Sequence, residues 1–223
     1  MSEQQTDQQR YSVSVHEAEG TPGAFIFTFM PKGVQQARAV GGQPNRVPRY
    51  VVAVRVDGDS VTFDWVATQD APGVAQQELE QEVRDRLEAR KAWVSRVTDL
   101  VALIEQWAKD LGWATRRIQK RLDDSYVGRH EVLGLLMQED TTRVLLEPVG
   151  RSAPGVGGVV DLYLMPAYDD IATLYYYDNG WNLHYSFPGT NGAVNTREAP
   201  GKPLSKDSLR EVLAEMKQHA ATA

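Results

Sequence analysis

The chain of 223 residues contains no cysteine. This absence excludes disulfide bonds, thiolate zinc sites and cysteine nucleophiles, and it is compatible with a reducing compartment. The chain also lacks any apolar run of the ~18 residues that a membrane span requires, and its first ten residues, MSEQQTDQQR, are polar. We therefore expect a cytoplasmic protein without a membrane segment, in which residues 1–10 form a disordered tail.

Basic side chains are scarce in the second half of the chain. Residues 123–201 carry 11 acidic and 4 basic side chains, and the formal net charge of the whole chain is −6. An acidic region repels phosphate backbones, so we expect no nucleic-acid partner. The basic strip in WATRRIQKRL, residues 113–122, lacks interleaved aromatic side chains and is interpreted as solvated charge beside acidic neighbours.

The sequence motifs of several enzyme classes are absent as well. There is no Gly-x-Ser-x-Gly nucleophile elbow, and His130-Glu131 lacks the second histidine of a zinc-protease motif. A restriction-type nuclease needs a lysine beside its paired carboxylates, but no lysine occurs between Lys120 and Lys202. The four histidines are scattered along the chain. We expect no cofactor and no metal site.

Hydrophobic alternation predicts an N-terminal β-rich unit over residues 11–72. Phe25, Phe27 and Phe29 occupy alternate positions of one strand, so one face of that strand is aromatic. A hairpin follows later in the unit, with an Asp-Gly-Asp sequence at its turn. Between these strands, residues 31–47 form a long loop rich in glycine, glutamine and proline, which is typical of a mobile or functional segment.

A long helical region is predicted over residues 73–111, because residues 74–111 contain neither glycine nor proline. Either one helix spans the region, or two helices bend near residues 89–95. The second half places apolar side chains at intervals of three and four residues, which predicts a buried stripe. Gly112 is expected to end the helix. The predicted stripe consists of Val94, Val97, Val101, Ile104, Ala108 and Leu111.

Residues 112–223 are predicted to form a C-terminal α+β domain, in which antiparallel strands are followed by a helix over residues 204–219. This helix begins at Ser205 or at a capping box made by Ser208 and Glu211. The expected fold class is therefore α+β: an N-terminal β-rich unit, a long bridging helix and a C-terminal antiparallel sheet closed by a terminal helix. In topology, the C-terminal order of helix, strands and helix resembles small acidic dimeric chaperones of bacterial secretion systems.

The stretch YYYDNGWNLHY predicts a β-hairpin over residues 173–186. Its Asn179-Gly180 dipeptide suits a two-residue turn, which would place Tyr175 opposite His184. Side chains alternate between the two faces of a strand, so the turn also sorts the residues by face. The expected core face holds Leu174, Tyr176, Leu183, Tyr185 and Phe187, and the expected polar face holds Thr173, Tyr175, Tyr177, Asn182, His184 and Ser186.

The polar face carries the candidate functional residues. Carboxylates and a histidine can do acid–base work if they converge in a pocket, whereas tyrosines on a flat face suit a contact surface. We expect the flatter surface, and hence a non-enzymatic binding or adaptor protein, with a chaperone-like role as one form of it. Its partner is another protein or a second copy of the chain, and the alternative function is a hydrolase-like enzyme. The candidate catalytic residues are Glu147, Asp161 and His184, the candidate binding residues are Tyr163, Tyr175 and Tyr177, and Arg143 joins the same face.

Overall fold

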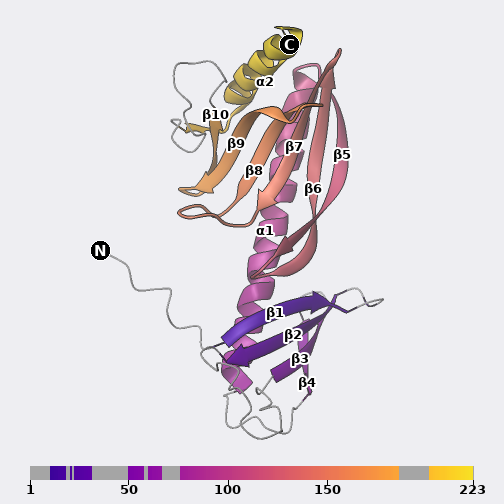
Figure 1. The fold of residues 1–223 in the computed structure, drawn as a ribbon, viewed down its shortest axis with the longest axis vertical. Helices are drawn as coiled ribbons and strands as arrows, with labels where there is room; N and C mark the ends of the chain where they lie inside the picture. Colours follow the sequence, from indigo (N-terminus) through magenta and orange to yellow (C-terminus); the bar gives the residue numbers. More distant parts are fainter. Residues whose placement is uncertain are drawn as a thin grey trace, which may run out of the picture. The chain divides into compact units, whose positions relative to one another are not determined.

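The computed structural model describes residues 11–18, 21, 23–31, 50–57, 60–66, 76–185 and 201–222 (Figure 1). The chain divides into two compact units, Met1–Arg90 with Asp123–Arg129, and Lys91–Leu122 with His130–Ala223. The tail expected at residues 1–10 and nearly all of the loop expected at residues 31–47 lie outside the described residues. No helix in the described part of the chain is long and apolar enough to cross a membrane.

The first unit is built on four strands: β1 (Tyr11–Glu17), β2 (Ala24–Pro31), β3 (Tyr50–Asp57) and β4 (Ser60–Val66). They form one antiparallel sheet in sequence order. The predicted alternation in β2 is confirmed, because Phe25, Phe27 and Phe29 are buried while Ile26 is exposed. The aromatic face of the sheet packs against the first half of α1 (Gln76–Asp110), where Leu79 joins the same core.

The long helical region is a single helix, α1, so the one-helix alternative is confirmed. Of the predicted stripe, Val97, Val101, Ile104 and Ala108 are fully buried, and the other two members are partly buried against the same core. The spacing of three and four residues therefore predicted the side of the helix that faces the second sheet.

The chain leaves α1 through Gly112, as predicted. Gly112 has a φ of +91°, a left-handed conformation that glycine adopts at little cost. Its N–H donates to the carbonyl oxygen of Lys109 at 3.0 Å, and the N–H of Trp113 donates to the carbonyl oxygen of Ala108 at 2.9 Å. These two bonds form a Schellman motif, which satisfies the last carbonyl groups of the helix and directs the chain into the next strand.

The larger sheet has seven strands: β5 (Ala114–Asp124), β6 (Gly128–Glu139), β7 (Thr142–Gly150), β8 (Val159–Met165), β9 (Asp169–Tyr177), β10 (Gly180–Tyr185) and β11 (Lys202–Pro203). Their order in the sheet is β11-β10-β9-β8-β7-β6-β5, so strands that follow each other in sequence are neighbours. The basic strip of the sequence analysis lies on β5. With its two antiparallel sheets, long helix and terminal helix, the chain has the predicted α+β fold.

One face of the larger sheet, which we call the inner face, packs against helices. Val144 of β7 and Leu162 of β8 form one core with Ile104 of α1 and Leu213 of α2 (Lys206–Thr222). Both helices therefore cover the same side of the sheet, with α1 behind β7 and β8 in the view of Figure 1. The alternate side chains point to the opposite side, which we call the outer face, and neither α1 nor α2 packs there.

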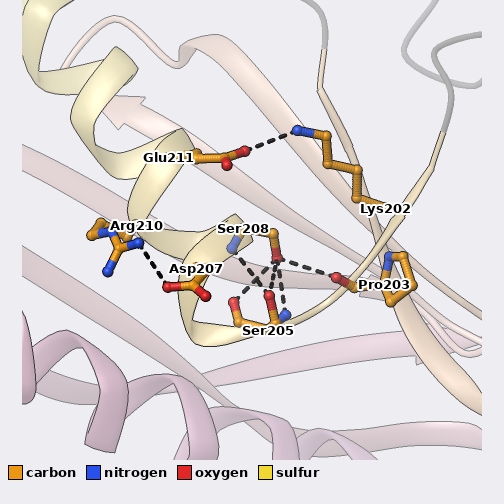
Figure 2. A network of polar contacts seen from close by, with 7 residues as sticks. All are labelled: Lys202, Pro203, Ser205, Asp207, Ser208, Arg210 and Glu211. Carbon is orange, nitrogen blue, oxygen red and sulfur yellow. Dashed lines mark hydrogen bonds and ion pairs between the residues drawn. The ribbon is translucent and has the colours of Figure 1, made fainter.

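A reciprocal serine cap begins α2, so the predicted box of Ser208 and Glu211 is wrong and the alternative cap is confirmed (Figure 2). The Ser208 N–H donates to Ser205 Oγ at 3.1 Å, and the Ser205 N–H donates to Ser208 Oγ at 2.9 Å. Glu211 instead pairs with Lys202 of β11 at 2.9 Å. The cap fails at Ser208 because that residue already lies within the first turn of the helix.

The predicted pairing of the hairpin between β9 and β10 is also wrong. The two-residue turn consists of Asp178 and Asn179, which have φ values of +50° and +59°. Tyr175 consequently lies opposite Asn182 and not opposite His184. Sliding the turn by one residue moves each pairing partner by two positions. Because side chains alternate with a period of two, every described residue of the hairpin keeps its predicted face.

Candidate functional site

A row of polar residues crosses the outer face of the larger sheet. Backbone pairing joins Glu147 of β7 to Asp161 of β8, Asp161 to Thr173 of β9, and Thr173 to His184 of β10. We call these four residues the polar row. The three candidate catalytic residues thus lie in one line on neighbouring strands, with Thr173 between the last two.

Asp161 is held in this row by two hydrogen bonds. Its Oδ1 accepts from Thr173 Oγ1 at 2.7 Å, and its Oδ2 accepts from the Tyr163 hydroxyl at 2.8 Å. Burial raises the pKa of the Asp161 carboxyl, and the charge of Glu147 adds to the rise, although the two hydrogen bonds act in the opposite direction. Burial and the bond to Asp161 also raise the pKa of Tyr163. Asp161 therefore takes up a proton more readily than an exposed aspartate.

Lys120 extends the polar row from the other edge of the sheet. Its Nζ lies 2.8 Å from Glu147 Oε1, and both side chains are partly exposed. Lys120 belongs to β5, which is separated from β7 by β6. The strands after residue 122 contain no lysine before Lys202, so the sequence pattern predicts no lysine near the carboxylates. Folding of the sheet supplies a lysine from an earlier strand.

Replacing Asp161 with asparagine is expected to flatten the dependence of stability on pH. The folded-state pKa lies above the ordinary aspartate value of 3.8, so the contribution of Asp161 is most favourable below that value and is lost as the pH rises through the folded-state pKa. Asparagine does not ionise, so the free energy of unfolding of Asp161→Asn should increase relative to the wild type as the pH rises above about 4. Urea unfolding at several pH values measures this difference.

Thr173→Val provides the opposing variant for this experiment. It removes a hydrogen bond that favours the ionised Asp161, so the loss of stability with rising pH should become steeper. Parallel pH profiles for the wild type and Asp161→Asn would contradict the raised pKa.

His184 lies in an aromatic cluster at the β10 end of the outer face. Its ring centroid is 5.0 Å from that of Tyr175 and 6.0 Å from that of Tyr177, and its Nε2 lies 3.1 Å from the Tyr177 hydroxyl oxygen. Gly201 passes directly over this cluster, since a Cβ there would collide with the His184 ring and lie 2.5 Å from the Tyr177 hydroxyl. Tyr175 and His184 are buried, so this part of the face is not the open surface that we expected.

A second row on the outer face is apolar. Backbone pairing joins Leu136 of β6 to Leu145 of β7, Leu145 to Tyr163 of β8, and Tyr163 to Ile171 of β9. We call these four residues the apolar row. Ile171 is 36% exposed, and Tyr168, in the turn before β9, is 51% exposed with its ring centroid 5.6 Å from that of Tyr163. Exposed aromatic and aliphatic surface is therefore gathered at one end of the apolar row.

Comparison of the chain with protein-family models, with curated proteins and with solved structures finds no match. The function is therefore argued from the geometry of the two rows. Within the described residues, no group of three or more histidine, aspartate or glutamate side chains is placed to hold a metal ion.

The candidate residues predicted from the sequence lie in three parts of the outer face: the polar row, the apolar row and the cluster around His184. The candidate catalytic residues come together in the polar row. Of the candidate binding residues, Tyr163 belongs to the apolar row, whereas the other two tyrosines lie in the cluster around His184. The sequence reasoning missed Tyr168 and Ile171. Alternation places Ile171 on the same face as Tyr175, but it carries no information on which of the two is exposed.

Proposed function

We propose that this protein is a non-enzymatic binding protein that holds a segment of another protein on the outer face of its larger sheet. The main support is the apolar row with the exposed Tyr168 beside it, on the face that neither helix covers. Exposed aromatic and aliphatic side chains gathered in one place are typical of protein contact surfaces, where tyrosine is enriched among the residues that contribute most to binding. The proposal corresponds to an adaptor or chaperone-like role in the cytoplasm.

The dimensions of the apolar row suit a short helix of the partner. Neighbouring strands lie ~4.8 Å apart, so a row across four strands spans ~14 Å. A helix of ~10 residues covers this distance, because it rises ~1.5 Å per residue. Apolar side chains three, four and seven residues apart on such a helix would face the row. The occupant that we propose is therefore an amphipathic helix of a partner protein.

The charged side chains beside the apolar row predict which charges the partner helix carries. Arg143 lies two positions before Leu145 on β7 and pairs with Met165 of β8, so a positive charge stands at one side of the row. On the other side, Lys120 neutralises Glu147 at 2.8 Å. The partner helix is accordingly expected to carry acidic residues along the edge next to Arg143.

Replacing both Tyr168 and Ile171 with serine is expected to weaken binding of such a helix about a hundredfold, because two exposed anchors each contribute ~1–2 kcal/mol. Helical peptides selected from a displayed library on the full chain provide the ligand, and fluorescence anisotropy measures Kd. Leu103→Ser is the matched control: Leu103 is an apolar residue of similar exposure, 43%, but it lies on α1. This control should bind as the wild type does.

Two results would contradict the proposal. One is equal affinity for the wild type and the double variant, or an equal loss in Leu103→Ser. The other is a wild-type dimer, measured by light scattering, that becomes a monomer in Tyr168→Ser, since a second copy of the chain would then cover the apolar row.

A second candidate function, a hydrolase-like reaction, rests on the polar row. Glu147 and Asp161 pair on adjacent strands, His184 lies two strands further along the row with Thr173 between, and Lys120 adds a positive charge beside the carboxylates. A thermal-shift screen of divalent metals, nucleotides and small acids distinguishes the two functions. A stabilisation by one compound that is lost in Asp161→Asn would favour the enzyme, whereas a flat screen together with helix binding would favour the binding protein.

A further inference from the structure

A hollow of about 360 Å³ opens on the outer face between β5, β6 and β7. It lies at the end of the sheet where β5 begins and β6 ends, next to the turn into β7. Apolar lining and two guanidinium groups meet in it. The residues that line the hollow are Ala114, Thr115, Arg116, Leu136, Gln138 and Arg143.

Arg143 is positioned in this hollow by one of its nitrogen atoms only. Its Nε–H donates to Gln138 Oε1 at 3.1 Å, and Gln138 is held in turn, because its Nε2 donates to the carbonyl oxygen of Asp140 at 3.0 Å. Within the described part of the chain, Arg143 makes no other hydrogen bond and no ion pair. A guanidinium has five N–H donors, so the terminal amino groups of Arg143 are available as a planar fork.

Arg116 adds a second positive charge to the hollow. It forms no hydrogen bond and no ion pair with any residue that the structure describes. The acidic residues at the end of β6 do not neutralise the two arginines, because Glu139 and Asp140 both pair with Lys217, at 3.2 and 3.1 Å. The hollow is thus a basic spot on a chain with a net charge of −6.

We propose that this hollow binds a carboxylate carried on a short apolar stem, namely a glutamate side chain of the partner helix; the identity of the ligand rests on the proposed function. A guanidinium fork matches the two oxygens of a carboxylate, and Ala114 and Leu136 would contact the methylene groups of the stem. The hollow also lies close enough to the apolar row. Arg143 and Leu145 are two residues apart on β7, a distance of ~7 Å along the strand, so a helix on the apolar row brings an acidic residue to the hollow.

Titration of the full chain, followed by NMR of the arginine side-chain Nε–H signals, tests this site. The probes are Nα-acetyl-glutamate amide, its glutamine counterpart and inorganic phosphate. The glutamate probe should shift the signals of Arg116 and Arg143 to saturation, and the glutamine probe should not. Arg143→Gln should lower the affinity for the glutamate probe about tenfold, because a charged pair of hydrogen bonds is lost. Arg121→Gln is the matched control, since Arg121 is an arginine of the same sheet, on β5, whose side chain pairs with Glu131 at 3.3 Å, and it should change nothing.

Three outcomes would overturn the inference: no shift of either arginine signal, equal affinity in Arg143→Gln and the wild type, or phosphate bound as tightly as the glutamate probe with the same dependence on Arg143. The probes are too small to occupy the apolar row, so Tyr168→Ser should leave the titration unchanged. The titration therefore tests the hollow even if no helix binds to the apolar row, and failure of the one proposal is distinguishable from failure of the other.

Discussion

Replacing Ile104 with alanine is expected to lower the free energy of unfolding of the second unit by ~2–5 kcal/mol. Ile104 is 0% exposed and belongs to the core that α1 forms with the inner face of the larger sheet. The substitution removes buried methyl groups and leaves a cavity that the close-packed neighbours fill only in part. Urea unfolding followed by tryptophan fluorescence measures the change.

Leu103→Ala provides the control for this measurement. Leu103 precedes Ile104 on the same helix and is 43% exposed, so its truncation should cost less than ~1 kcal/mol. Equal losses in the two variants would contradict the packing of α1 against the inner face. A loss below ~0.5 kcal/mol for Ile104→Ala, the range of ordinary surface substitutions, would do so as well.

Replacing Phe29 with alanine is expected to destabilise the first unit by ~3–5 kcal/mol. Phe29 is fully buried, its ring centroid lies 6.5 Å from that of Phe27, and both rings belong to the core formed with the first half of α1. Among the residues that the structure describes, this core shares no buried residue with the core of the second unit. Amide hydrogen exchange should therefore become faster in β2 and β3, while the amides of β7 and β8 keep their protection.

Ile26→Ala is the control for Phe29→Ala. Ile26 belongs to the same strand but is 37% exposed on the opposite face, so its truncation should change the exchange of β2 only slightly. Comparable acceleration in both variants would contradict the burial pattern of the first sheet. Loss of protection in β7 and β8 would contradict the separation of the two cores.

The long helix and its end could be predicted from local chemistry. A run without glycine or proline, with apolar side chains at intervals of three and four residues, has one periodicity and hence one buried side. Gly112 is the residue best suited to the left-handed position that follows a helix, and the structure places it there with a φ of +91°. Local chemistry does not decide where α2 begins, because Ser205 and Ser208 are both good cap residues and lie three positions apart.

The hairpin between β9 and β10 has a register that local chemistry does not predict. Asp178, Asn179 and Gly180 all tolerate positive φ, so the sequence permits the turn at either of two places. The structure takes the place that sets Leu174 opposite Leu183, two buried residues of the core. Which residues pair across the two strands is decided in the folded sheet, and the turn preferences of these three residues do not specify it.

The sequence by itself determined the period of each element, and with it the face on which every described residue of the hairpin lies. That result survived the wrong register because a shift of two positions restores the same face. Only the tertiary structure decided which residues meet across the strands. Lys120 reaches Glu147, and Tyr163 stands between Leu145 and Ile171, because the order of the strands and their registers bring distant segments together. Exposure is likewise a property of the folded layers, since Tyr175 is covered and Ile171 is open on the same face of one strand.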